Sequence, residues 1–384
     1  MSCQLLTNAT VVLADEVREK LAVLIEDGKI AALDPQHTAG ATVVDLEEHT
    51  LIPGMIDLHC DSLEKEVEPR PGVYFPIDFA CAQADKRNAS AGITTVFHAL
   101  SFANREFGVR NNETAAELGR SIHAWQAHAL IDNRFHARFE VTDVTAPPVL
   151  SSLMDEGVID LISFMDHSPG QGQFRDVESF RKYLANAYKA DAATLDEIMR
   201  QKAEAAKGAI ERMQQLAALA RAKGVAIASH DDDSAAKIDV VRDLGATISE
   251  FPINLETAQA ARANGIATLF GAPNILRGKS QSGNMRALDA VLAGVADCLC
   301  GDYSPASLLP ATFKLPEVTD VSLAHAVALV TRNPARAAGL NDRGEIAVGQ
   351  RADLVAVQRI GGLPHADQVW SRGKLVLGAS RVHH

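Results

Sequence analysis

Residues 51–61 read LIPGMIDLHCD, an apolar run that ends in His59, Cys60 and Asp61. Its length and composition predict a β-strand with both faces covered. Seven further runs of this kind alternate with helical patterns along the chain: 92–100, 135–141, 158–166, 224–230, 246–251, 266–273 and 297–302. Eight buried strands that alternate with helices predict a parallel α/β fold, and eight is the strand number of a (β/α)8 barrel. No GxGxxG motif follows the first strand, which disfavours a doubly wound dinucleotide-binding fold.

The two ends of the chain differ in pattern from the middle. Both alternate apolar and polar residues, and turn signals such as Asp27-Gly28 and Arg372-Gly373 separate the alternating runs. This period of two predicts short antiparallel strands. Neither end has enough apolar surface for a core of its own, so we expect both to combine in one small β-sandwich. The expected boundaries are 1–52 and 343–384 for the sandwich and 53–342 for the barrel.

Composition limits the class of protein. The chain has 384 residues, 47% of them hydrophobic, which is enough for a large core. Its net charge of −12 disfavours a nucleic-acid or membrane-surface binder, but local cations or metals could still bind a small anionic substrate. We find no signal segment and no apolar run near the ~20 residues of a membrane span. Five cysteines in no disulfide-like spacing predict reduced thiols in a cytoplasmic protein. The sequence does not decide whether the chain forms a homo-oligomer.

Two segments of the barrel region carry local predictions. An Ala-rich segment from roughly Leu195 to Lys223 has the period of an amphipathic helix. Cys298 and Cys300 have metal-ligand chemistry, but period two already places them on one face of a buried strand, which is the interpretation that we adopt.

Almost every predicted strand ends in His, Asp or Glu. In a barrel these ends converge on one mouth, where barrel enzymes place their sites. A single histidine there is more often a core or loop residue, but the recurrence at equivalent ends favours a metal site. Imidazole and carboxylate ligands suit Zn²⁺, with Mn²⁺ or Fe²⁺ as alternatives, and we expect one or two such divalent ions. The candidate ligands are His59, Asp61, Glu140, His167, His230 and Asp302.

Two loops carry cations close to these strand ends. The loop RGKSQSGN at 277–284 follows the seventh strand and combines cations, hydroxyls and glycines, as phosphate-binding loops do. The alternative is an ordinary polar loop with a helix N-cap at Ser282 or Asn284. In the second loop, after the first strand, Pro69 and Pro71 restrict the backbone and could direct nearby cations into the mouth. The candidate substrate-binding residues are Lys65, Arg70, Arg277, Lys279, Ser280 and Ser282.

These motifs resemble those of the amidohydrolase superfamily. Residues 51–61 are similar to its first-strand signature, Asp302 occupies the place of its strand-eight aspartate, and 333–357 is similar to its return into the terminal sandwich. The stretches SFMDHSPGQ at 163–171 and GAPNILRGKSQSGN at 271–284 resemble one branch, the diphosphatases of phosphonate catabolism. Two positions depart from that branch pattern, because Gln281 replaces a histidine and His98 replaces an aspartate.

The resemblance implies a metal-dependent hydrolase that cleaves a phosphoanhydride of α-D-ribose 1-methylphosphonate 5-triphosphate and releases pyrophosphate. We expect Asp302 to take a proton from the attacking water, and His98 is the next candidate base. The alternative is hydrolysis of a carbon–nitrogen bond, as in a deaminase or a cyclic amidase, on the same metal site. The cationic loops favour the phosphate substrate, because a neutral heterocycle would not need them.

Overall fold

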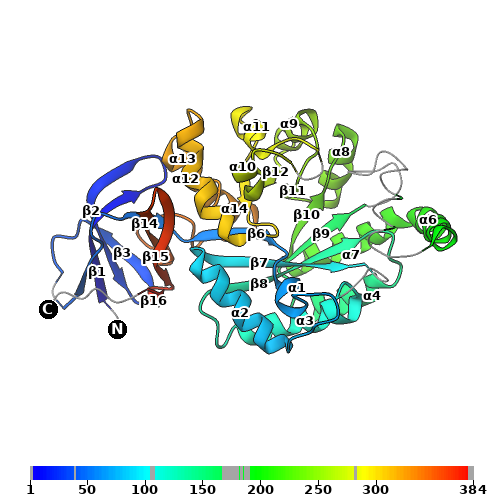
Figure 1. Cartoon of the computed structure of the whole chain (residues 1–384), viewed down its shortest axis with the longest axis horizontal. Helices are drawn as coiled ribbons and strands as arrows, with labels where there is room; N and C mark the ends of the chain where they lie inside the picture. Colours follow the sequence, from blue (N-terminus) through cyan, green and yellow to red (C-terminus); the bar gives the residue numbers. More distant parts are fainter. Residues whose placement is uncertain are drawn as a thin grey trace.

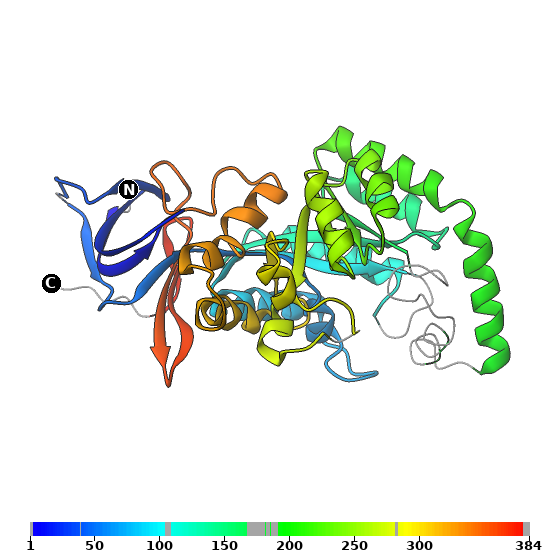
Figure 2. The same cartoon turned by 90° about the horizontal axis from the view of Figure 1, so that it is seen from above.

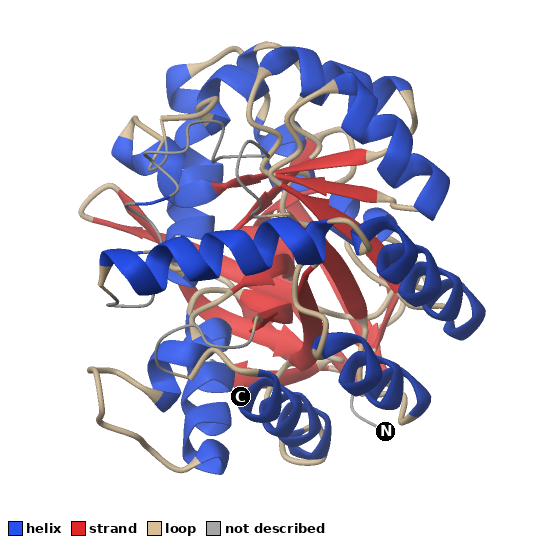
Figure 3. Ribbon diagram, turned by 90° about the vertical axis from the view of Figure 1, so that its right-hand side faces the viewer, coloured by secondary structure: helices blue, strands red, loops and turns tan. Residues whose placement is uncertain are grey.

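The computed structural model describes residues 3–38, 40–103, 109–166, 181, 185, 191–280 and 283–378. Within them, eight parallel strands form a single sheet in chain order and surround the centre of the larger unit (Figure 3). The strands are β6 (Met55–Cys60), β7 (Ile93–Phe102), β8 (Asp132–Glu140), β9 (Leu161–Met165), β10 (Ala226–His230), β11 (Ile248–Glu250), β12 (Ala267–Gly271) and β13 (Cys298–Cys300). The (β/α)8 barrel predicted from the alternating runs is confirmed.

The barrel closes between its first and last strands. Cys60 and Asp302 form a parallel bridge, in which the Asp302 amide donates to the His59 carbonyl at 2.9 Å. Apolar side chains such as Leu58 and Phe97 fill the barrel interior together with Cys298 and Cys300. Both cysteines are buried free thiols, as the period of two predicted, and the chain's other three cysteines are also free.

Helices cover the outside of the barrel (Figure 1). They are α1 (Leu63–Val67), α2 (Ile77–Ser90), α3 (Asn112–Trp125), α4 (Ala146–Asp155), α6 (Ala192–Ala206), α7 (Ala209–Lys223), α8 (Ala235–Leu244), α9 (Leu255–Ala263), α10 (Ala272–Arg277), α11 (Ala287–Leu292), α12 (Leu308–Val318), α13 (Leu323–Ala328) and α14 (Arg332–Ala337). In the described part of the chain, we find no helix with the length and apolarity that a bilayer crossing requires.

The Ala-rich segment forms two helices, α6 and α7, where one amphipathic segment was predicted. The break falls at Lys207 and Gly208, and glycine is a poor helix residue because it gains so much backbone freedom on unfolding. The guanidinium of Arg212 donates to the carbonyl of Ala205 in the last turn of α6 and to that of Val141 at 2.7 Å. These bonds satisfy a carbonyl that would otherwise need a continuing helix.

Both chain ends contribute to one separate sheet, as predicted, at the opposite end of the molecule from α6 (Figures 1 and 2). Its strands are β1 (Cys3–Val12), β2 (Val17–Glu26), β3 (Lys29–Leu33), β4 (Thr42–Asp45), β5 (Thr50–Pro53), β14 (Leu354–Ile360), β15 (Leu363–Ser371) and β16 (Lys374–Leu377). The sheet is mixed and not purely antiparallel, because β1 runs parallel to β4 and β5. It curls around an apolar core that includes Leu51, Leu354 and Trp370.

An ionic network joins this sheet to the N-terminal end of the barrel. Asp132, the first residue of β8, accepts hydrogen bonds from Arg343, whose guanidinium also donates to Thr95 at 3.0 Å. Arg134 lies 3.2 Å and Arg351 3.5 Å from the same carboxylate. Burial alone would raise the pKa of Asp132, but these arginines outweigh it and lower the pKa to about 2. The segment that leads into β14 is therefore held to the barrel by charge.

Candidate active site

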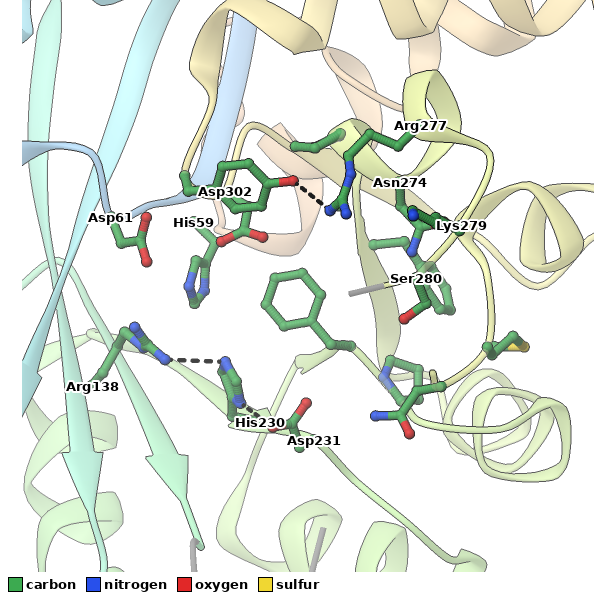
Figure 4. Close-up of a pocket in the computed structure, with 18 of the residues that line it drawn as sticks. His59, Asp61, Arg138, His230, Asp231, Asn274, Arg277, Lys279, Ser280 and Asp302 are labelled. Carbon is green, nitrogen blue, oxygen red and sulfur yellow. Dashed lines mark hydrogen bonds and ion pairs between the residues drawn. The ribbon is translucent and has the colours of Figure 1, made fainter. Parts of the chain in front are cut away.

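A cavity of about 850 Å³ opens at the carboxyl ends of the barrel strands (Figure 4). Its walls come from loops that follow six of the eight barrel strands and from strand-end residues, which is the usual place of a barrel active site. The polar side chains that line it are His59, Asp61, Arg110, Arg138, His230, Asp231, Asn274, Arg277, Lys279, Ser280, Asn284, Asp302 and Tyr303.

Three buried side chains, two of which line the cavity, form a candidate metal centre. His59, His230 and Glu250 each offer one donor atom, and these atoms lie within 4.8 Å of one another. His59 Nδ1 is 3.0 Å from Glu250 Oε1, and the second oxygen of Glu250 is buried and accepts no hydrogen bond within the described ranges. Two imidazoles and a carboxylate suit a divalent transition ion, so this donor set fits the metal that the sequence predicts.

The phenyl ring of Phe251 lines the cavity and packs against both imidazoles. Its centroid lies 5.0 Å from that of His59 and 5.2 Å from that of His230, both in edge-to-face geometry. Phe251 has φ 54°, and Asp231 and Asp302, which also follow barrel strands, each have φ 53°. Left-handed backbone is unfavourable for such residues and concentrates at functional sites. Asp231 and Phe251 directly follow His230 and Glu250 of the candidate metal centre, and Asp302 lies just beyond the end of β13.

Two carboxylates face the cavity beside the histidines. Asp61 and Asp302 both line it, and the Asp61 amide donates to the Asp302 carbonyl at 3.2 Å. Burial first, and then the nearby charge of Asp61, raise the pKa of Asp302 to about 7. The residue before Asp302 is Gly301, where the chain packs so closely that a Cβ would lie 2.5 Å from Asp57 Oδ2 and 2.7 Å from Pro305 Cα.

The structure brings together seven of the predicted site residues. These are His59, Asp61, His230, Arg277, Lys279, Ser280 and Asp302, all of which line the cavity. Lys65 lies on α1 and Arg70 forms a bridge with Val73; both are exposed and neither lines the cavity. The candidates His167 and Ser282, and the branch departure at Gln281, lie outside the described residues.

Glu140 and His98 are also placed away from the cavity. The Glu140 carboxylate accepts a hydrogen bond from Thr142 at 2.7 Å and lies 3.8 Å from the ammonium of Lys202 on α6. His98 donates to the side chain of Asn133 at 2.9 Å, which in turn donates to Asp85 on α2. His98 thus lies between the barrel wall and its helices, and we leave both residues out of the proposed site.

Residues that the sequence candidates did not include are Arg110 and Arg138, which line the cavity, and Glu250, which contacts His59. Glu250 ends β11 and was visible as a strand-end carboxylate, but its contact with His59 could not be read from spacing. Arg138 lies two residues before Glu140 on β8, so alternation alone could have placed it at the mouth. Arg110 follows β7 and donates to Glu64 at 2.8 Å, with Asp61 at 3.9 Å. The site therefore has more positive charge than the two loops indicated.

Comparison with known proteins defines the class. Residues 50–376 match the amidohydrolase family, so the chain belongs to this family and is a hydrolase. It is 37% identical to the α-D-ribose 1-methylphosphonate 5-triphosphate diphosphatase of Escherichia coli (strain K12), across 97% of this chain and 100% of that protein. This relative belongs to the branch whose motifs the sequence resembles.

Solved structures support the fold. N-acetylglucosamine-6-phosphate deacetylase from Pasteurella multocida is 13% identical, with a TM-score of 0.68 over 97% of this chain and 99% of that one. The 5-methylcytosine deaminase from Klebsiella pneumoniae is 15% identical, with a TM-score of 0.63 over 99% of both chains. At such identities the likeness shows the shared architecture alone, because one barrel serves many reactions.

Proposed function

We propose that the chain hydrolyses a phosphoanhydride of α-D-ribose 1-methylphosphonate 5-triphosphate and releases pyrophosphate. The observation that carries the proposal is that Arg138, Arg277 and Lys279 line the same cavity as His59 and His230, which form the candidate donor set together with Glu250. A substrate with several phosphoryl groups needs such cations, since each charge-assisted contact contributes about 1.5–3 kcal/mol. The 37% identity to the Escherichia coli diphosphatase across nearly the whole chain supports the same substrate class.

In the proposed reaction, one or two divalent ions, zinc first among them, would be held by His59, His230 and Glu250, with Asp61 and Asp302 adjacent. Such an ion lowers the pKa of a bound water to roughly 7 and so makes it a nucleophile at neutral pH. His167, a further candidate ligand, stays a prediction.

The residues of the chain then have separate tasks. Asp302 accepts the proton of the attacking water as its oxygen forms a bond to phosphorus, while the bridging P–O bond breaks and its electrons leave with pyrophosphate. Arg277 and Lys279 hold phosphoryl oxygens on one wall of the cavity. Ser280 lies beside them and can donate a hydroxyl hydrogen bond.

The rival is hydrolysis of a carbon–nitrogen bond, which the deaminase fold neighbour illustrates but does not favour for this chain. To decide, purified enzyme loaded with zinc or manganese is given the phosphonate triphosphate, and pyrophosphate release is measured beside ammonia release from cyclic amides and aminated heterocycles. Pyrophosphate from the triphosphate is the expected result. Ammonia release with no pyrophosphate would establish the rival. The free thiols fit a reducing compartment, so we extend the proposal to a cytoplasmic location.

A further inference from the structure

Arg138 is a buried cation with no carboxylate within ion-pair distance in the part of the chain that the structure describes. Arg138 is 9% exposed and lines the cavity. Its Nε atom makes no hydrogen bond to the described residues. The contact that it does make is from Nη2 to His230 Nε2, at 3.3 Å. Burial of a guanidinium without a counter-ion in contact is costly, whereas Arg343, which is also buried within the described ranges, is paired with Asp132. The position of Arg138 therefore calls for an anion that enters the cavity.

The neighbouring cation differs from Arg138 in this respect. Arg110 also lines the cavity, but its guanidinium lies 2.8 Å from Glu64 and 3.9 Å from Asp61. Its charge is therefore already compensated in the protein. Arg138 acts on Asp302 and Glu64 only through space and makes no contact ion pair among the described residues, so its guanidinium can still bind an anion directly.

Arg138 lies across the cavity from the loop after β12. In Figure 4, His59, His230 and Asp302 lie between Arg138 on one side and Arg277 and Lys279 on the other. A chain of phosphoryl groups that reached from the loop to the histidines would place its reacting phosphorus next to Arg138. The loop cations would then bind groups that do not react.

The contact with His230 also links Arg138 to the candidate metal centre. The nitrogen that accepts from Nη2 is His230 Nε2, and a nitrogen that binds a metal ion cannot also accept a hydrogen bond. Metal binding through this atom releases the guanidinium for an anion at the same place. Loss of Arg138 should consequently leave metal affinity unchanged or stronger, which separates its role from that of a residue that merely supports His230.

We propose that Arg138 is a catalytic residue that binds the phosphoryl group under attack and stabilises the negative charge that develops on its oxygens. This inference rests on the proposed function, because it assigns Arg138 to that reaction. A preorganised donor in a water-poor site commonly contributes about 10²–10³ in kcat. Its geometry also predicts that a lysine, which is a point charge without the planar fork of arginine, restores only part of the rate.

The test compares metal-loaded wild type with Arg138→Met and Arg138→Lys. Arg120→Met serves as the matched control, because Arg120 is on the surface of α3 and pairs with Glu156. We expect kcat for pyrophosphate release to fall about 10²–10³-fold in Arg138→Met. We also expect a smaller loss in Arg138→Lys, partial rescue of Arg138→Met by added guanidinium, and normal turnover in Arg120→Met. Metal affinity, measured by titration with zinc, should be unchanged or tighter in both Arg138 variants.

Two results would overturn the inference. One is an Arg138→Met enzyme with full metal and a kcat within about threefold of wild type. The other is a variant that loses zinc, because Arg138 would then act through His230. If wild type releases no pyrophosphate, the proposed function fails, and binding of inorganic pyrophosphate to the zinc-loaded proteins tests Arg138 separately. Weaker binding to Arg138→Met than to wild type would support the anion site, and equal or absent binding would overturn it.

Discussion

His59 Nδ1 lies 3.0 Å from Glu250 Oε1, and both side chains are almost fully buried. Burial, followed by the charge of Arg138, lowers the pKa of His59 well below its usual value, so the ring is neutral. A neutral ring with its proton on Nδ1, donated to Glu250, has its lone pair on Nε2. This pair of residues thereby sets the tautomer and the orientation that a metal ligand needs.

Replacement of Glu250 by Gln should weaken metal binding by about 10–100-fold, the usual cost of losing a carboxylate that orients a ligating histidine. The amide oxygen can still accept from Nδ1, but it has no charge. Glu250→Ala should cost more, because it removes the acceptor as well. Zinc affinity, measured by titration and by metal content after dialysis, checks this expectation.

The matched control for this prediction is Glu256→Gln, in the exposed first turn of α9, which should bind zinc normally. An unchanged zinc affinity in Glu250→Gln would show that Glu250 neither orients His59 nor ligates the ion.

Asp302→Asn should lower turnover far more than it lowers metal content. The amide keeps the shape and a weak oxygen ligand, but it cannot take the proton of the attacking water. Loss of a general base typically costs about 10²–10⁴ in rate. Steady-state kcat and metal content of the same sample check this, and a nearly normal kcat with full metal would place the base elsewhere.

The barrel was predictable because its strands are long apolar runs whose polar ends repeat. Because such runs are apolar on both faces, their sequence does not show which side chains point into the barrel and which point toward the helices. All ten residues of β7 are buried, so burial in this strand does not separate the inner face from the outer face. Phe97 packs inside the barrel, whereas His98, the next residue, contacts Asn133 outside it. The histidine at the end of β10 therefore lines the cavity, whereas the histidine of β7 points away from it.

Contacts between distant segments were the part that the sequence could not supply. Glu250 and His59 are 191 positions apart, and neither spacing nor composition pairs them. Likewise, Glu140 has the right residue type at a strand end, but Lys202 from α6 and the hydroxyl of Thr142 hold its carboxylate away from the cavity. Such pairings depend on how loops and helices fold back over the barrel.

Asp132→Asn should destabilise the protein by about 2 kcal/mol at pH 7, because the folded-state pKa is about 2 and the ordinary value is 3.8. Since the folded pKa is lowered, the contribution is fully present above about pH 4 and is lost as the pH falls through 2. The difference in unfolding free energy between wild type and variant should accordingly shrink to roughly half by pH 3.

Urea unfolding at pH 7, 5 and 3 measures this difference. Asp342→Asn is a suitable comparison, because Asp342 also accepts from Arg343, at 2.7 Å, but is far more exposed. It should cost less at every pH. A difference that grew as the pH fell would contradict the assigned charge of Asp132.

The loop after β12 should affect binding more than chemistry, in contrast to Arg138. Arg277→Ala or Lys279→Ala should raise KM for the triphosphate about tenfold to a hundredfold, with metal content unchanged, because each removes a charge-assisted contact to a phosphoryl oxygen. Arg277 donates to the Tyr303 hydroxyl at 3.0 Å, so Tyr303→Phe should raise KM by a smaller factor through looser placement of the guanidinium.

Gln281→His should leave the enzyme active or improve it, since histidine can carry charge toward phosphate. Steady-state kinetics on the four variants check these expectations, and a fall in kcat with unchanged KM would show instead that the loop contacts the reacting group.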